Sequence, residues 1–417
     1  MGETKISCVY PRLQLAYLLQ FAIWGSWNIA LGGFLNSVHM PGWQIGYIFM
    51  AIPLGAIIAP MFIGPIADRF FSAQKVLGLL HLISGVALAL CGLICLQGMK
   101  EGSVSFPNLM ILMLLSGICY MPSIPLINTV VFKHLPNVSS APRVFIFGTV
   151  GWILVNLVVE IFCEGATKPY FFFVGGGCGI FLGLYSFTLP NTPPKGAPSK
   201  GEKNDVLGLE ALRMFKNPIF TMFVLCAFMV SIFGSNYYFP ALVPYLSEHG
   251  YPAPLALGTL NQFSELFFMA ILGFCVYRFG LKWVLVFGMS AWAVRYFLFT
   301  IDGFHFALIG LLLHGLAYAF LYTAAYMFGD RVAPPQLKAS VQSLLAFLLL
   351  GIGQVLSGWI YGYQLDKCAP QLTGTVALAT VQKEETITTT EKLIKTEAPK
   401  AEAPKAEVKK EAPKAEA

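Results

Sequence analysis

Residues 44–66 read QIGYIFMAIPLGAIIAPMFIGPI, and Ala67, Asp68 and Arg69 follow them directly. This run carries no charged residue. A segment of about 20 such residues crosses a bilayer as a helix, because hydrocarbon offers the backbone no hydrogen-bond partner. Comparable apolar runs occur along most of the chain, so an all-α membrane protein is predicted. The eleven predicted spans are 13–35, 44–66, 76–97, 107–128, 144–163, 169–190, 219–240, 255–276, 281–300, 304–328 and 340–363.

The composition leads to the same class. Of the 417 residues, 56% are hydrophobic and 12% are charged, whereas a soluble domain usually carries about 25% charged residues. Residues 366–417 hold nine Lys and nine acidic residues, so the net charge of +6 belongs to the first 365 residues, where most charges lie between the spans. It does not indicate a nucleic-acid partner. The nine cysteines show neither a zinc spacing nor a disulfide framework. No metal, no cofactor and no enzymatic motif is therefore expected.

The charges between the spans predict the orientation. With the N-terminus in the cytoplasm, the connections on the inner side hold fifteen Lys and Arg residues, and those on the outer side hold only Lys100 and Lys168. This asymmetry is the positive-inside pattern of multi-pass proteins. We expect a protein of the inner (plasma) membrane with a cytoplasmic N-terminus.

The longest gap divides the spans into six and five. Its residues 191–218 are rich in Pro, Gly and Lys, and Asp205 to Phe215 has the spacing of an amphipathic helix, with a plain linker as the alternative. The predicted parts are a bundle over 1–190, this linker, a bundle over 219–363 and a disordered Lys/Glu/Ala/Pro-rich tail over 364–417. A weak internal repeat supports two halves, because Gly and Arg stand five positions apart both in Gly64 to Arg69 and in Gly273 to Arg278.

This repeat of two halves, together with Gly64 to Arg69, resembles the major facilitator fold, which has twelve helices in two bundles. The expected twelfth helix is missing after Tyr363. Natural loss and an altered reading frame are both compatible with the tail.

Polar residues inside the predicted spans mark candidate functional positions, because charge in a membrane is costly. Glu265 lies near the middle of the eighth span, and Gln262 stands one turn earlier on the same face. A carboxylate in a low-dielectric site favours its neutral form, as a proton carrier requires. The alternative role for Glu265 is a structural ion pair with Arg295, which is the only basic residue deep in a span.

Three further groups share helix faces. They are Phe145, Thr149 and Trp152 in the fifth span, Phe233 and Asn236 in the seventh, and His314 and Tyr318 in the tenth. Aromatic surfaces beside amide and hydroxyl groups suit a planar, hydrogen-bonding solute such as a nucleoside. Ordinary helix packing is the alternative for each group.

At these positions the chain resembles the nucleoside:proton symporter family of the major facilitator superfamily. The matching stretches are 19–27, 67–75, 120–122, Asn128, 148–152, 262–265 and 313–315. The resemblance implies a substrate site of Thr149, Trp152, Asn236, Gln262, Glu265, His314 and Tyr318, with Glu265 as the proton-coupling residue. A family Arg is replaced by Phe145, a family acid by Ala319, and a family Gln by Phe233.

The predicted function is proton-coupled nucleoside uptake by alternating access, carried out by a monomer. Two alternatives stay open. The chain transports another small polar solute, as the three altered positions suggest, or it is a transport-defective descendant that binds or senses a solute.

Overall fold

The computed structural model describes residues 3–69, 71–136, 140–194, 208–235 and 237–367. Every regular element within these ranges is a helix. The prediction of an all-α membrane protein is therefore confirmed. Asn236 and the tail beyond residue 367 lie outside the described residues, so the predictions made for them stay predictions.

The helices follow one another with short connections. The first group of elements is α1 (Glu3–Asn28), α2 (Ala30–Ser37), α3 (Gly42–Arg69), α4 (Ala73–Glu101), α5 (Phe106–Tyr120), α6 (Ser123–His134), α7 (Pro142–Phe162) and α8 (Tyr170–Ser186). The second group is η2 (Leu209–Lys216), α9 (Pro218–Val230), η3 (Ser231–Ser235), α10 (Tyr238–Glu248), α11 (Pro254–Phe279), α12 (Leu281–Phe299), α13 (Phe304–Tyr318), η4 (Ala319–Thr323), α14 (Ala324–Val332), η5 (Pro335–Leu337), α15 (Lys338–Ala346) and η6 (Phe347–Ile352), followed by helical residues 353–367.

Within the described residues, ten helical segments are long and apolar enough to cross a membrane, and Tyr170–Ser186 is a shorter apolar helix. Several segments join two or three elements. Val9–Ser37, for example, contains most of α1 and all of α2, and Pro335–Lys367 contains α15 and η6. The eleven predicted spans each overlap one of these helices, because a long uncharged run can satisfy its backbone in lipid only by folding as a helix.

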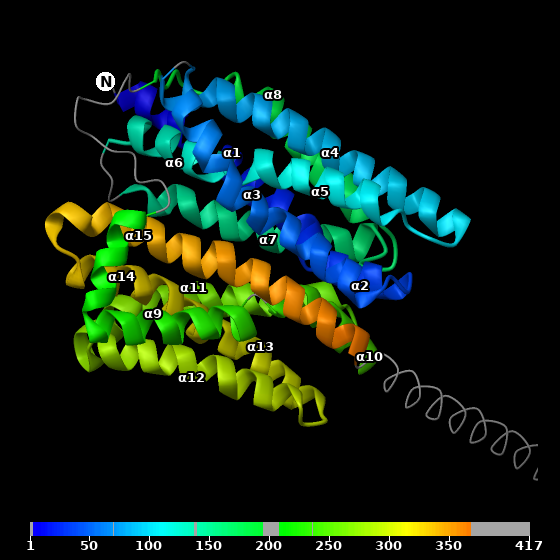
Figure 1. The fold of residues 1–417 in the computed structure, drawn as a ribbon. Coiled ribbons are helices and arrows are strands. Elements are labelled where there is room, and N and C mark those ends of the chain that lie inside the picture. Colours follow the sequence, from blue (N-terminus) through cyan, green and yellow to red (C-terminus); the bar gives the residue numbers. More distant parts are fainter. Residues whose placement is uncertain (1–2, 70, 137–139, 195–207, 236, 368–417) are drawn as a thin grey trace, which may run out of the picture. The chain divides into compact units, whose positions relative to one another are not determined.

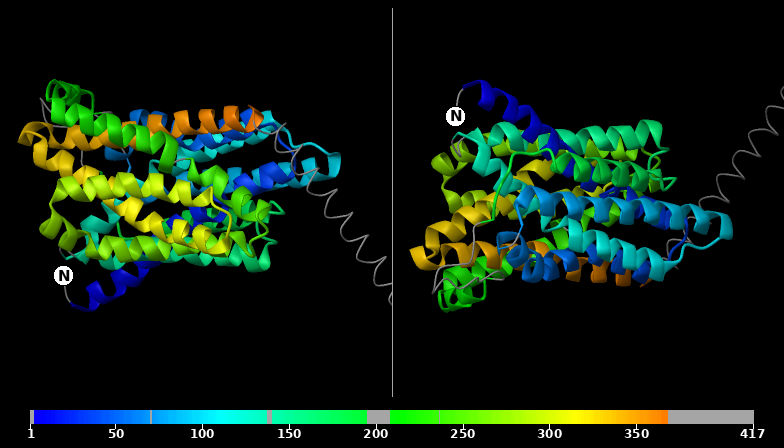
Figure 2. Two further views of the ribbon diagram at one scale, coloured as in Figure 1. Left: turned by 90° about the horizontal axis from the view of Figure 1, so that it is seen from below. Right: turned by 90° about the horizontal axis from the view of Figure 1, so that it is seen from above.

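Figure 1 shows the helices of the first group, blue to cyan-green, gathered beside those of the second group, green to orange. Figure 2 shows that most of the long helices run in roughly one direction. Within the first group α1 packs on α7 and α4 on α8, and within the second α13 packs on α11 and α12. Across the groups α2 contacts α10, α7 contacts α11, and α3 contacts η6.

Several contacts across the groups lie at the end of the helices where α2 meets α10. There the Glu160 carboxylate of α7 accepts a 2.9 Å hydrogen bond from the backbone N–H of Leu255, in the first turn of α11. Gly46, near the start of α3, packs against the backbone of Gly358, and a Cβ on Gly46 would stand 2.4 Å from the Gly358 carbonyl oxygen. The groups are therefore closed against each other at this end.

The connection between the groups contains a short helix, η2, of 3-10 type. Residues three apart share a face of such a helix. Leu209 and Leu212 accordingly share one face and are 53% and 51% exposed, whereas Ala211 and Met214 are buried. An amphipathic α-helix was expected from Asp205, a residue outside the described range, and the described helix begins at Leu209.

We expect Gly46→Ala to lower the free energy of unfolding by about 1–3 kcal/mol, because backbone atoms cannot yield to the added methyl group. Gly273→Ala on α11 is the matched control, since a Cβ there meets no atom within 4 Å. It should be neutral or slightly stabilising, as Ala is the better helix former. Thermal denaturation of the purified variants measures both effects. Equal stability of the two variants would show that the α3 contact is loose.

Candidate functional site

A pocket of about 240 Å³ lies where α1, α7, α11 and α13 come together. Seven of the eight predicted substrate-site residues line this pocket, and the eighth, Asn236, is not among the described residues; the seven are Phe145, Thr149, Trp152, Gln262, Glu265, His314 and Tyr318. Together with Phe239 of α10, five helices thus contribute to one cavity. Its lining residues are Tyr17, Phe21, Trp24, Phe145, Gly148, Thr149, Trp152, Phe239, Gln262, Glu265, His314 and Tyr318.

Aromatic rings from α1 and α7 form the wall contributed by the first group. Tyr17 stacks on Phe145 with ring centroids 4.9 Å apart, and Trp24 meets Trp152 edge-on at 5.7 Å. The Tyr17 hydroxyl donates a hydrogen bond to Asn128 Oδ1 at 3.2 Å, which fixes the ring. Such rings offer flat apolar faces to a planar solute.

The opposite wall depends on a close approach of α11 and α13 at Gly315. A Cβ on this residue would lie 2.2 Å from the carbonyl carbon of Ser264, so only glycine fits without moving a helix. The Ser264 hydroxyl donates to the Leu312 carbonyl and accepts from the Gly315 N–H at 3.2 Å. These bonds hold Glu265, the neighbour of Ser264, on the same cavity as His314, the neighbour of Gly315.

Glu265 and Arg295 do not form the ion pair considered from the sequence. Among the residues that the structure describes, no cation lies within 4.0 Å of the Glu265 carboxylate, and none donates a hydrogen bond to it. Arg295 instead donates to His314 Nδ1 at 3.0 Å and to Asn261 Oδ1 at 3.3 Å. The structural ion-pair interpretation is therefore wrong for this conformation.

Aromatic rings surround the buried Arg295 guanidinium. Its central carbon lies 4.5 Å from the Tyr238 ring centroid, 5.2 Å from that of Phe299 and 5.3 Å from that of Trp292. The negative face of an aromatic ring attracts a cation, most strongly where water is excluded. The side chain is completely buried, so these rings and two hydrogen bonds replace its hydration.

Two buried polar atoms on the pocket lack a partner within the described part of the chain. They are Trp152 Nε1, which is a donor, and Gln262 Oε1, which is an acceptor. Buried polar groups are almost always hydrogen-bonded, and an unpaired one requires an explanation such as water or a ligand. The pocket therefore presents one donor and one acceptor for a polar solute. No group of three or more His, Cys, Asp or Glu side chains among the described residues could hold a metal ion.

A family model described as "Nucleoside H+ symporter" matches residues 8–383 of this chain. The chain belongs to this family. It is 32% identical over 369 residues to YegT of Escherichia coli (strain K12), covering 85% of this chain and 84% of YegT. It is 27% identical over 376 residues to the xanthosine permease of the same organism, covering 85% of this chain and 87% of the permease.

Solved structures carry the same fold. The crystal structure of the nucleoside transporter NupG superposes with a TM-score of 0.75 at 23% identity, covering 86% of this chain and 91% of NupG. A bacterial homologue of the human lysosomal transporter Spinster, in an inward-facing and unoccupied conformation, gives a TM-score of 0.70 at 18% identity, covering 91% of this chain and 86% of that one. The expected major facilitator fold is thereby confirmed, and these matches are to transporters and not to enzymes.

In this member of the nucleoside H+ symporter family, Arg295 fixes the tautomer of His314. Arginine can only donate hydrogen bonds, so the 3.0 Å contact requires an unprotonated Nδ1 on His314. The proton of the neutral ring is then on Nε2. Because His314 lines the pocket, the imidazole offers an N–H donor on the side of the ring away from Arg295.

Four aromatic residues of the pocket were missed from the sequence. Tyr17, Phe21 and Trp24 repeat at i, i+4 and i+7 on α1, which is the same spacing as Phe145, Thr149 and Trp152 on α7. That periodicity was enough to predict these three residues as one face of α1. Phe239, the fourth, had no such signal, since it follows the π-helix η3 and its phase cannot be read from spacing.

Two altered family positions do not line the cavity. Phe233 lies in η3, is 54% exposed and does not line the pocket in this conformation. A π-turn adds a residue to the turn and so changes the face that the next side chains occupy. Ala319, the first residue of the π-helix η4, is fully buried away from the pocket.

We predict that His314 in the purified protein is a neutral Nε2–H tautomer, as the Arg295 hydrogen bond requires. Nitrogen-15 NMR of histidine-labelled protein measures this directly, and His314→Phe identifies which of the six histidine signals belongs to it. Arg295→Met should allow both tautomers, because the donor is lost. A protonated Nδ1 in the unmodified protein would contradict the assignment.

Proposed function

We propose that this protein is a proton-coupled nucleoside uptake transporter of the inner membrane. The observation that carries the proposal is one pocket that combines stacked aromatic rings, an unpaired donor and acceptor, and a carboxylate without a counter-ion. Membership of the nucleoside H+ symporter family and similarity to the xanthosine permease support it. The pocket volume of about 240 Å³ suits a small solute, because sites for drug-sized ligands occupy about 300–1,000 Å³.

The proposed substrate contacts divide between the two groups of helices. Phe145 and Trp152 supply ring surfaces for the nucleobase, and Thr149 supplies a hydroxyl. On the other wall Gln262 and His314 supply hydrogen bonds, and Tyr318 stacks on His314 with centroids 5.8 Å apart. Asn236 belongs to this proposed site through the family resemblance. A solute held by both walls links the two groups.

Transport follows the alternating-access plan of the fold. The two groups of helices are proposed to be the two bundles, joined through residues 191–218, and to rock about the pocket. They are closed at the end where α2 meets α10, so this conformation offers the pocket to the opposite side. With a cytoplasmic N-terminus, which the positive-inside pattern supports, that side is the cytoplasm. We further propose that one chain is the transporting unit.

Protonation of Glu265 is the proposed coupling step. Its carboxylate has no cation within 4.0 Å among the described residues, so a negative charge there is uncompensated in a membrane. Binding of a proton removes that charge before the bundles reorient. Release of the proton on the more alkaline side restores the charge and prevents return in the loaded form.

We expect Glu265→Gln to abolish uphill uptake while sparing exchange of nucleoside. The amide keeps the size of the side chain and cannot lose a proton. With one proton per nucleoside, a pH difference of one unit drives about tenfold accumulation, and the variant should stop near equal concentrations. Proteoliposomes with labelled nucleosides, with and without a pH gradient, measure both modes.

Glu248→Gln on α10 is the matched control for Glu265→Gln, because Glu248 is exposed and lies outside the pocket. It should accumulate nucleoside like the unmodified protein. If Glu265→Gln accumulates nucleoside under a pH gradient as strongly as the unmodified protein does, Glu265 is not the coupling residue.

We expect Trp152→Phe to weaken nucleoside binding about tenfold, since a buried hydrogen bond to substrate contributes about 1–1.5 kcal/mol, while phenylalanine keeps a smaller aromatic ring at this position. Gln262→Leu should have a similar effect through loss of its acceptor. Trp359→Phe is the control, because Trp359 is 53% exposed and outside the pocket. Equilibrium binding to purified protein gives the affinities. Unchanged affinity in both site variants would place the solute elsewhere.

The second candidate function is transport of another small polar solute. It is favoured by Phe145, which stacks on Tyr17 at the pocket, where the family pattern commonly has an arginine. A panel of labelled nucleosides, nucleobases and sugars tests it in the same proteoliposomes. Binding of a solute without any flux would instead indicate a sensing descendant.

A further inference from the structure

We propose that an anionic phospholipid occupies a second, lipid-facing groove between α9, α12 and α14. The groove has a volume of about 540 Å³ and is separate from the substrate pocket, with which it shares no residue. Apart from the basic residues Lys282 and Arg331 and the thiol of Cys226, its side chains are hydrocarbon, aromatic or thioether groups. The proposal concerns a different ligand from the transported solute and does not depend on it.

The shape of the groove suits an acyl chain. Leu285 and Phe223 are 6% and 9% exposed, whereas Met222 and Val286 are 65% and 39% exposed. Buried side chains thus form its floor and exposed ones its rim. From Lys282 to Met289 the lining of α12 spans eight residues, which is roughly 10 Å along a helix. This length matches the upper part of a fatty-acyl chain that hangs from a headgroup at the membrane surface.

Positive charge is confined to one end of the groove. Lys282 stands in the first turn of α12 and Arg331 in the last turn of α14, and both are exposed. The adjacent helices α12 and α14 pack on each other, which brings these two ends together. Apolar residues lie deeper in the membrane, and cations lie at its surface. That order is the order of acyl chain and phosphate in a lipid.

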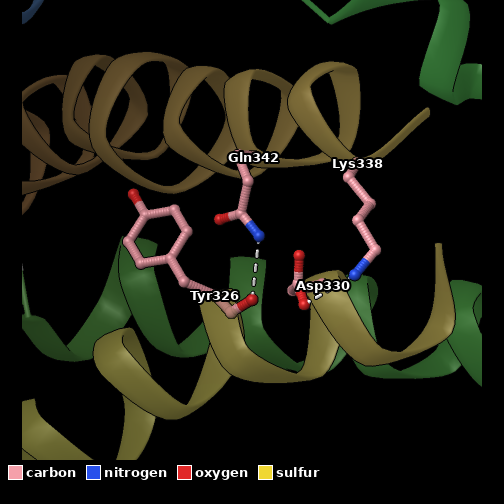
Figure 3. Close-up of polar contacts among 4 residues, drawn as sticks. All are labelled: Tyr326, Asp330, Lys338 and Gln342. Atoms are coloured by element: carbon pink, nitrogen blue, oxygen red, sulfur yellow. Dashed lines mark hydrogen bonds and ion pairs between the residues drawn. The ribbon is translucent and has the colours of Figure 1, made fainter. Parts of the chain in front are cut away.

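Nearby acids do not neutralise this end. Asp330, next to Arg331 in the chain, is paired with Lys338 of α15 at 2.9 Å, and Gln342 joins the same two helices by a 2.9 Å bond to the Tyr326 carbonyl (Figure 3). Within the described residues neither Lys282 nor Arg331 is in an ion pair. An anionic headgroup therefore meets two available cations, whereas a zwitterionic headgroup brings its own positive charge.

Native mass spectrometry of the full chain in detergent tests the proposal. The protein is titrated separately with dioleoylphosphatidylglycerol, with dioleoylphosphatidylcholine and with inorganic phosphate, and the affinities are compared. We expect phosphatidylglycerol to bind most tightly and Lys282→Gln/Arg331→Gln to weaken it roughly 30-fold, since each basic residue contributes about a factor of five at an anionic surface. Lys282→Arg/Arg331→Lys keeps both charges and should retain binding.

Lys75→Gln/Lys133→Gln is the matched control, because both lysines are exposed on α4 and α6, away from the groove. It should bind phosphatidylglycerol like the unmodified protein. Four results would each overturn the proposal. Phosphatidylcholine or free phosphate could bind as tightly as phosphatidylglycerol. The control variant could lose as much phosphatidylglycerol binding as Lys282→Gln/Arg331→Gln, or the protein could form a dimer that excludes lipid from the groove. None of these outcomes affects nucleoside transport, so this proposal and the proposed function fail separately.

Discussion

The structure depends on one constraint, which is that hydrocarbon offers no hydrogen bonds. Each spanning segment must satisfy its own backbone as a helix, and each polar side chain must find a partner inside the protein. The apolar surface on the outside needs no explanation beyond lipid contact. The polar groups inside do, and some of them form two clusters. One is the pocket around Glu265, and the other is the buried network of Gln20, His81, Tyr120 and Ser123 in the first group.

That second network shows how a membrane histidine can be purely structural. His81 Nε2 lies 2.8 Å from Gln20 Oε1, and the Gln20 amide donates to Ser123 at 2.8 Å. These bonds tie α1, α4 and α6 together away from the pocket. His314 has the same side chain and a different environment, because its partner is a cation that can only donate. The neighbouring group, and not the residue type, determines whether a donor is left for a solute.

The two groups of helices contribute unequal chemistry to the pocket. The first group supplies mainly ring surface through α1 and α7, and the second supplies the carboxylate, the amide and the imidazole through α11 and α13. The second group also contains the π-helices η3, η4 and η6 among its described residues. Such turns are common at functional sites because they re-aim side chains without ending the helix. The polar side chains of the pocket are thus concentrated in the half with the less regular helices.

The sequence by itself determined the membrane class, the approximate helix positions and seven of the pocket residues, because length, hydropathy and periodicity act within one helix. Phe145, Thr149 and Trp152 could be grouped since they share a face of α7. Only the tertiary structure decided which faces meet. Arg295 pairs with His314 and not with Glu265, and Phe233, within the π-helix η3, is exposed. Periodicity gives the face of a residue on its own helix, whereas its partner depends on how neighbouring helices are rotated and how closely residues such as Gly315 let them approach.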